Sequence, residues 1–165
     1  MRNGWKGALS ALALLAAAGA FAQAANPAPM AREGTYEQTL CFGGPAHLVT
    51  ASDTDRYGTY QTTGGTQSAT KAFDSMSLEC IGTFELRSSV YKHKGYCVFQ
   101  DASGDKFHAT DTATPQAYTV ELLGGTGKFK GITGSANIER LGAMIPVRQG
   151  TIQGCRRVTG SYKLP

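Results

Sequence analysis

From residue 34 to the C-terminus, the chain consists of short runs of β-prone residues separated by clusters of Gly, Asp, Ser and Thr. None of these runs keeps the 3.6-residue apolar period of an amphipathic helix. All but three of the 21 glycines lie in this part of the chain, and abundant glycine without a helix signal is typical of turns and tight barrel corners. The pattern predicts an all-β domain, with a helical turn only near residues 127–132.

Roughly nine or ten runs qualify as strands, because each is rich in β-branched or aromatic residues and ends at a turn signal. They cover residues 34–42, 46–52, 56–62, 76–87, 95–101, 106–111, 116–123, 135–141, 146–153 and 156–163. Short strands at such regular spacing are typical of a sandwich or a meandering barrel. The spacing leaves both architectures open for a single domain over residues 34–165.

The N-terminus has the pattern of a secretory signal. Arg2 and Lys6 precede an apolar run over residues 8–21, and small-x-small cleavage sites follow at residues 20–24. The run is shorter than the ~20 residues that a transmembrane helix needs. We expect a cleaved signal peptide over residues 1–25, a flexible lead over residues 26–33, and a mature protein without a membrane span in the periplasm or outside the cell.

Four cysteines lie in the exported part: Cys41, Cys80, Cys97 and Cys155. An even number of cysteines in an oxidising compartment favours disulfides over free thiols. Their spacing contains no CxxC pair, which argues against a zinc site and against thioredoxin-like chemistry. We expect two disulfides, no metal and no cofactor.

Strand alternation favours one of the three possible pairings, because it places Cys80 on the same apolar face as Leu78 and Cys97 on the same face as Phe99. If residues 95–101 fold back on residues 76–87, Cys80 and Cys97 meet on that face. The prediction is therefore a Cys80–Cys97 disulfide.

The other two cysteines fall on polar faces, Cys41 beside Glu37 and Cys155 beside Arg157. A Cys41–Cys155 disulfide would link the first strand to the end of the chain, as barrel closure requires.

Three segments carry a resemblance to a known family: residues 95–107 (GYCVFQDASGDKF), 124–134 (GGTGKFKGITG) and 150–163 (GTIQGCRRVTGSYK). Together they resemble the barrel superfamily of allene oxide cyclases and dirigent proteins, and most of all its exported proteobacterial members. The resemblance implies a single antiparallel barrel of about eight strands over residues 34–165, whose lumen can hold an apolar small molecule. No motif around the family's catalytic residues matches, so their roles are not transferred.

Polar side chains on apolar strand faces are the candidates for contact with a ligand in the lumen. Gln38 and Tyr118 alternate in phase with apolar neighbours, whereas Tyr57 and Tyr60 face opposite ways, so that one of them points inward. We select Gln38, Tyr57 and Tyr118, because a tyrosine in an apolar lumen can donate a hydrogen bond to a ligand oxygen. The alternative is a core tyrosine whose hydroxyl reaches the backbone or water.

Charged and titratable residues show weaker signals. Alternation turns Glu37 outward, and if Glu79 and Glu85 also face outward, the lumen lacks a general base. Solvated surface positions are expected for His47, His93 and His108, and also for Arg140, Arg148, Arg156 and Arg157, although these arginines would attract an anionic ligand if they lined a barrel mouth.

Two loops imitate ligand-binding motifs. Asp101, Ser103 and Asp105 resemble the start of a calcium loop but lack its terminal glutamate and flanking helices, so ordinary turn chemistry is expected. Residues 124–128 lack the spacing of a phosphate-binding loop.

The net charge of +4 falls to about +2 without Arg2 and Lys6. This charge is too small to indicate a nucleic-acid partner.

Three functions are compatible with these patterns. The first is a non-enzymatic barrel that binds a small apolar or amphipathic ligand in its lumen. The second is an isomerase or cyclase acting on a hydrophobic small molecule, which requires an inward-facing acid or base. The third is a structural or envelope-interaction protein with a lumen packed by side chains.

Overall fold

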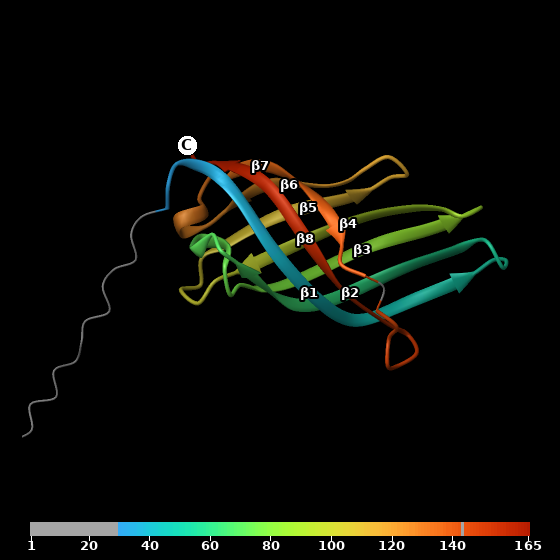
Figure 1. Cartoon of the computed structure of the whole chain (residues 1–165). Coiled ribbons are helices and arrows are strands. Elements are labelled where there is room, and N and C mark those ends of the chain that lie inside the picture. Colours follow the sequence, from blue (N-terminus) through green and yellow to red (C-terminus); the bar gives the residue numbers. More distant parts are fainter. Residues whose placement is uncertain (1–29, 143) are drawn as a thin grey trace, which may run out of the picture.

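The strands of this protein form a closed antiparallel barrel (Figure 1). The computed structural model describes residues 30–142 and 144–165. Each strand pairs with its neighbour in the sequence, and β8 (Thr151–Lys163) pairs with β1 (Glu33–Thr50) to close the barrel. The other strands are β2 (Arg56–Ser68), β3 (Ser77–Arg87), β4 (Val90–Gln100), β5 (Lys106–Ala113), β6 (Tyr118–Gly125) and β7 (Thr133–Arg140).

The predicted all-β barrel is confirmed, and the signal peptide expected over residues 1–25 lies outside the described residues. The flexible lead expected over residues 26–33 is too long at its C-terminal end. The Arg32 carbonyl accepts a hydrogen bond from the Leu164 amide (N–O distance 2.6 Å), and Glu33 already belongs to β1.

Two pairs of predicted strands are single strands in the structure. Residues 34–42 and 46–52 both belong to β1, which continues through Gly43, Gly44 and Pro45 without a change of register. A Cβ atom on Gly44 would lie 2.2 Å from the Gln61 carbonyl oxygen, so this glycine permits close contact between strands and does not end one. Residues 146–153 and 156–163 likewise give only β8, which begins at Thr151.

Two short 3₁₀ turns, η1 (Lys71–Phe73) and η2 (Gly127–Phe129), close one end of the barrel. They place Phe73 and Phe129 in the lumen with no exposed surface, and each is followed three residues later by another buried side chain, Met76 or Ile132. The turn expected near residues 127–132 is η2, whereas η1 was not predicted. We call this end, covered by η1 and η2, the closed end.

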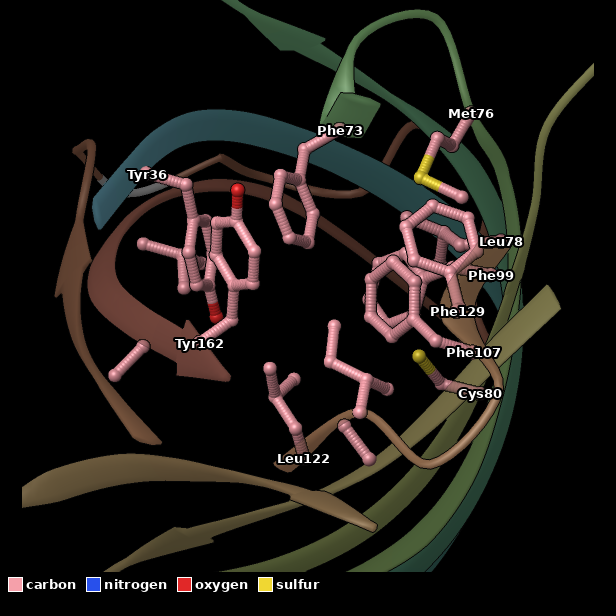
Figure 2. Close-up of a cluster of buried hydrophobic side chains, with 14 of the residues drawn as sticks. Tyr36, Phe73, Met76, Leu78, Cys80, Phe99, Phe107, Leu122, Phe129 and Tyr162 are labelled. Carbon is pink, nitrogen blue, oxygen red and sulfur yellow. The ribbon is translucent and has the colours of Figure 1, made fainter. Parts of the chain in front are cut away.

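An aromatic core fills the closed end (Figure 2). Phe73 stacks on Tyr36, with ring centroids 4.3 Å apart, and Phe107 stacks on Phe99 at 4.4 Å. Phe73 contacts Phe107 edge-on at 5.6 Å, which joins the two stacked pairs, and Phe129 contacts Phe107 edge-on at 5.2 Å. Side chains in these close ring contacts fill this end of the lumen.

The turn between β4 and β5 holds η2 in place. One oxygen of Asp101 accepts hydrogen bonds from the backbone amides of Ser103 and Asp105, both at 2.9 Å, and from the Ser103 hydroxyl. Its other oxygen forms an ion pair with the ammonium group of Lys128, while Asp105 accepts the backbone amide of Lys128 at 3.0 Å. The polar groups that imitate a calcium loop therefore serve turn structure and the attachment of η2.

Both predicted disulfides are present. Cys41–Cys155 joins residues 114 positions apart across the β1–β8 seam, and Cys80–Cys97 links β3 to β4. Two disulfides are typical of proteins that fold in an oxidising compartment. Among the described residues, no helix is long and apolar enough to cross a membrane.

The Asp101 carboxylate makes the free energy of unfolding of the barrel fall as the pH becomes acidic. Burial alone would raise its pKa, but the hydrogen bonds from Lys128, Ser103 and Asp105 outweigh burial and lower the pKa from 3.8 to about 2. A lowered folded-state pKa contributes stability that is present above pH ~4 and is lost as the pH falls toward 2. We expect Asp101→Asn to destabilise the protein at neutral pH, with the difference from wild type shrinking below pH ~4.

Urea denaturation over a pH series, with wild type and Asp101→Asn measured side by side, checks this expectation. A stability difference that stays constant from neutral pH down to pH ~2 would contradict it.

Candidate functional site

A cavity of about 280 Å³ lies in the lumen beyond the aromatic core. This volume lies just below the range of about 300–1,000 Å³ that is usual for small-molecule pockets. Its apolar wall is formed chiefly by Leu40, Phe42, Phe84, Phe99, Val120, Ile138 and Ile152. Its polar lining includes Tyr60, Tyr91, His93, Asp111, Tyr118 and Arg156. A largely apolar cavity with a few convergent polar groups is the usual form of a small-molecule site.

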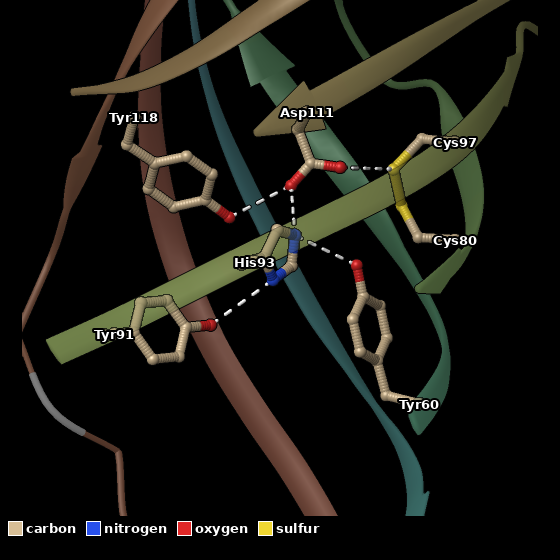
Figure 3. Close-up of polar contacts among 7 residues, drawn as sticks. All are labelled: Tyr60, Cys80, Tyr91, His93, Cys97, Asp111 and Tyr118. Atoms are coloured by element: carbon tan, nitrogen blue, oxygen red, sulfur yellow. Dashed lines mark hydrogen bonds and ion pairs between the residues drawn. A yellow bond between two sulfur atoms is a disulfide. The ribbon is translucent and has the colours of Figure 1, made fainter. Parts of the chain in front are cut away.

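A buried pair, His93 and Asp111, is the centre of the polar groups (Figure 3). Nε2 of His93 on β4 lies 2.5 Å from Oδ2 of Asp111 on β5, and the two side chains are only 8% and 11% exposed. Register places the two residues near the same end of the barrel, since Gly95 of β4 pairs with Asp111 and Ala113 pairs with His93. This end lies opposite η1 and η2.

Three tyrosine hydroxyls surround the pair. The Tyr118 hydroxyl donates to Oδ2 of Asp111 at 3.0 Å, the Tyr60 hydroxyl lies 3.1 Å from Nε2 of His93, and the Tyr91 hydroxyl lies 3.2 Å from Nδ1. An Nε2–H of His93 can donate to Asp111, while Nδ1 forms a hydrogen bond with the Tyr91 hydroxyl whose direction depends on the tautomer of the ring. The network then connects one carboxylate, one imidazole and three phenols.

Burial keeps these phenols protonated. It raises the pKa of Tyr60, Tyr91 and Tyr118 above the usual value of 10.0, and the negative charge of Asp111 adds to this rise in all three. Arg156 opposes the rise in the pKa of Tyr91 and Tyr118 without cancelling it. All three hydroxyls are therefore hydrogen-bond donors at neutral pH.

A glycine makes room for the network. Gly95 pairs directly with Gly82 across β3 and β4, so this patch of the luminal wall carries no side chains. A Cβ atom on Gly95 would lie 2.2 Å from Oδ1 of Asp111 and 2.4 Å from the Tyr60 hydroxyl oxygen. The backbone of β4 thus sets the position of both polar groups.

The Cys80–Cys97 disulfide forms the wall beside Asp111. Sγ of Cys97 lies 3.9 Å from Oδ1 of Asp111, but a disulfide sulfur carries no proton, so this approach is a contact and not a hydrogen bond. Among the described residues, no three His, Cys, Asp or Glu side chains gather as ligands for a metal ion.

The three residues selected from the sequence as ligand contacts lie in three different environments. Tyr118 lines the cavity. Gln38 faces inward and is only 3% exposed, but it does not line the cavity. The choice of Tyr57 is wrong: it is 39% exposed and faces outward, and Tyr60 on the same strand takes the luminal position. Glu37 faces outward as expected, with a side chain that is 65% exposed.

Sequence reasoning missed His93, Asp111 and Arg156. The predicted strand begins at residue 95 and leaves His93 at the surface, whereas β4 begins at Val90 and its alternation turns His93 toward the lumen. Asp111 follows Phe107 and Ala109 on the inner face of β5, but the predicted strand ends at this residue. The prediction places Arg156 in solvent, yet it alternates in phase with the buried Val158.

Comparisons with protein-family models, with curated proteins and with solved structures found no match to this chain. The assignment of an eight-stranded barrel therefore rests on the strand pairing in the structure alone. The resemblance to allene oxide cyclases and dirigent proteins stays a prediction.

Replacing Tyr118 by Phe tests the protonation of the buried phenols. Because Tyr118 stays protonated in the folded protein, its removal should leave the rise of phenolate absorbance unchanged in an alkaline titration to pH ~11. In urea, where every tyrosine is in water, the wild type should show one more ionising phenol than Tyr118→Phe. A smaller rise in the folded variant, with native circular dichroism retained, would contradict the burial argument.

Proposed function

We propose that this protein is an exported barrel that binds a small amphipathic molecule in its lumen. The observation that carries the proposal is that one end of the lumen is packed with side chains while the rest holds a cavity. Side chains fill the closed end, while the cavity beyond it has a largely apolar wall and one group of convergent hydrogen-bonding side chains. Such a cavity takes an apolar body and orients it through a small number of polar contacts.

The packed-lumen alternative explains only half of the barrel. The buried rings of Phe73, Phe107 and Phe129 account for the closed end. A purely structural protein has no need for an unfilled cavity beside His93, Asp111 and three tyrosines, since empty space in a core gives up packing contacts. The disulfides and the signal-like N-terminus support a site of action in the periplasm or outside the cell.

A side chain that fills the cavity should abolish binding. Val120 lines the cavity from β6, so Val120→Phe should weaken binding of the fluorescent apolar probe N-phenyl-1-naphthylamine at least about tenfold, because it takes up space that the probe needs. Val98 lies on the outer face of β4 and is 46% exposed, so Val98→Phe is the matched control.

Fluorescence titration of the three proteins measures the effect. Equal affinities of Val120→Phe and wild type would show that the probe binds outside the lumen. No binding by the wild type would count against the proposed function.

Proton transfer in the lumen is a second candidate function, favoured by Asp111. The glutamates considered from the sequence do not line the cavity, but Asp111 supplies the inward-facing carboxylate that an isomerase needs. It can accept a proton from a carbon next to a carbonyl group, while the hydroxyl of Tyr60 or Tyr91 donates a hydrogen bond to the carbonyl oxygen. The Asp111 proton then returns to another carbon of the same substrate.

Solvent deuterium exchange measures this activity without knowledge of the natural substrate. 2-Tetralone is a small apolar ketone with acidic carbon-bound protons, and its exchange in D₂O can be followed by NMR. The wild type should accelerate exchange, and Asp111→Asn should lower the catalysed rate by about 10²-fold or more. Asp53→Asn, in the exposed loop after β1, is the control. A rate unaffected by Asp111→Asn would rule out this role.

A further inference from the structure

Two arginines face each other across strands β7 and β8. Arg140 pairs directly with Arg156 in the strand register, and directly opposite residues of an antiparallel pair present their side chains on the same face. Arg156 lines the cavity, so this face is the luminal one. Like charges in directly opposite positions destabilise a sheet.

Neither arginine has a carboxylate partner. All Asp and Glu residues of the chain belong to its described part, and none of their oxygens lies within 4.0 Å of either guanidinium group. Arg157, the residue after Arg156, lies on the outer face and does form ion pairs. Its guanidinium nitrogens lie 3.3 Å from a carboxylate oxygen of Glu139 and 3.8 Å from one of Glu37. The barrel thus neutralises the outward arginine and leaves the two luminal ones uncompensated.

Aromatic rings hold both guanidinium groups at the cavity. The Arg156 Cζ atom lies 5.2 Å from the centre of the Phe42 ring, and the Arg140 Cζ atom lies 4.6 Å from the centre of the Tyr91 ring. Phe42 and Tyr91 both line the cavity. Stacking on rings orients a guanidinium group without using its hydrogen-bond donors.

Arg156 has an unsatisfied donor. One of its terminal nitrogens donates to the Cys155 carbonyl oxygen at 3.0 Å, but its Nε–H is buried and has no partner among the described residues. A buried donor without an acceptor costs free energy, and more so on a charged group. An acceptor oxygen that enters the cavity would satisfy this group and separate the two positive charges.

We propose that Arg140 and Arg156 form an anion subsite, and that the ligand of the lumen is therefore a small apolar molecule with one acidic group. This inference rests on the proposed binding function and narrows its ligand class. The acidic group lies between the two guanidinium groups, the apolar body occupies the cavity, and Asp111 repels an alternative pose in which the acidic group points toward β5. The arginines set both the affinity and the orientation of the ligand.

A pair of probes with the same ring system separates charge from apolar burial. 2-Naphthoate carries a carboxylate, whereas 2-naphthalenemethanol is neutral and of nearly the same size. Calorimetric titration of the wild type should give at least about tenfold tighter binding of 2-naphthoate, since hydrogen bonds to charged groups are the stronger class. High salt should reduce the preference.

Variants test whether the two arginines cause the preference for 2-naphthoate over 2-naphthalenemethanol. The double variant Arg140→Gln/Arg156→Gln should lose this preference, because its affinity for 2-naphthoate falls while its affinity for 2-naphthalenemethanol stays the same. Arg157→Gln, which removes one positive charge from the outer face, should keep this preference. If the double variant does not fold, Arg140→Gln alone, at the exposed end of β7, should still reduce the preference severalfold.

The outcomes distinguish this inference from the proposed function. Equal binding of both probes by the wild type, or a preference that survives loss of the arginines, overturns the anion subsite but leaves a ligand-binding lumen. Failure of the wild type to bind either probe overturns both.

Discussion

The pairing of β1 with β8 is the constraint on which the rest of the molecule depends. It runs from Glu33 opposite Lys163 to Pro45 opposite Thr151, and without it the sheet would have two free edges and no lumen. The Cys41–Cys155 disulfide crosses this seam on the outer face, between residues that are directly paired. A covalent link between distant parts of the chain removes entropy from the unfolded state, so it favours the closed barrel without occupying luminal space.

Closure creates an interior, and the two ends of that interior are used differently. The connections β2–β3 and β6–β7 each form a 3₁₀ turn with a phenylalanine at its end, and these two rings enter the same end of the barrel. The burial of aromatic surface there provides a stable base. Because the closed end supplies this packing, the opposite end can keep a cavity beside a group of buried polar side chains.

Alternation along strands was the most informative signal in the sequence, and its limits explain the errors. It identified both disulfides and the inward position of Tyr118, because strand parity does not depend on where a strand ends. Alternation did not identify His93 and Asp111, because the predicted strands over residues 95–101 and 106–111 are shorter than β4 and β5 at the ends where these two residues lie. The recurrence of Thr-x-x-Phe-x-x-(Met or Ile) at residues 70–76 and 126–132 was available in the sequence and marks both 3₁₀ turns. Pairing partners such as Arg140 and Arg156 could not be obtained, since register is a property of the folded sheet.

The placement of charge inside the barrel gives the cavity a direction. The carboxylate of Asp111 projects from β5, whereas the two uncompensated guanidinium groups project from β7 and β8, and Tyr91 contacts both Arg140 and the imidazole of His93. Opposite charges held on separate strands act on any polar molecule that lies between them. Under the proposed function, a ligand with one acidic end takes one orientation, in which a group that reacts with Asp111 is held away from the group that binds the arginines. The proposed binding and the proposed proton transfer would therefore use the same arrangement of side chains.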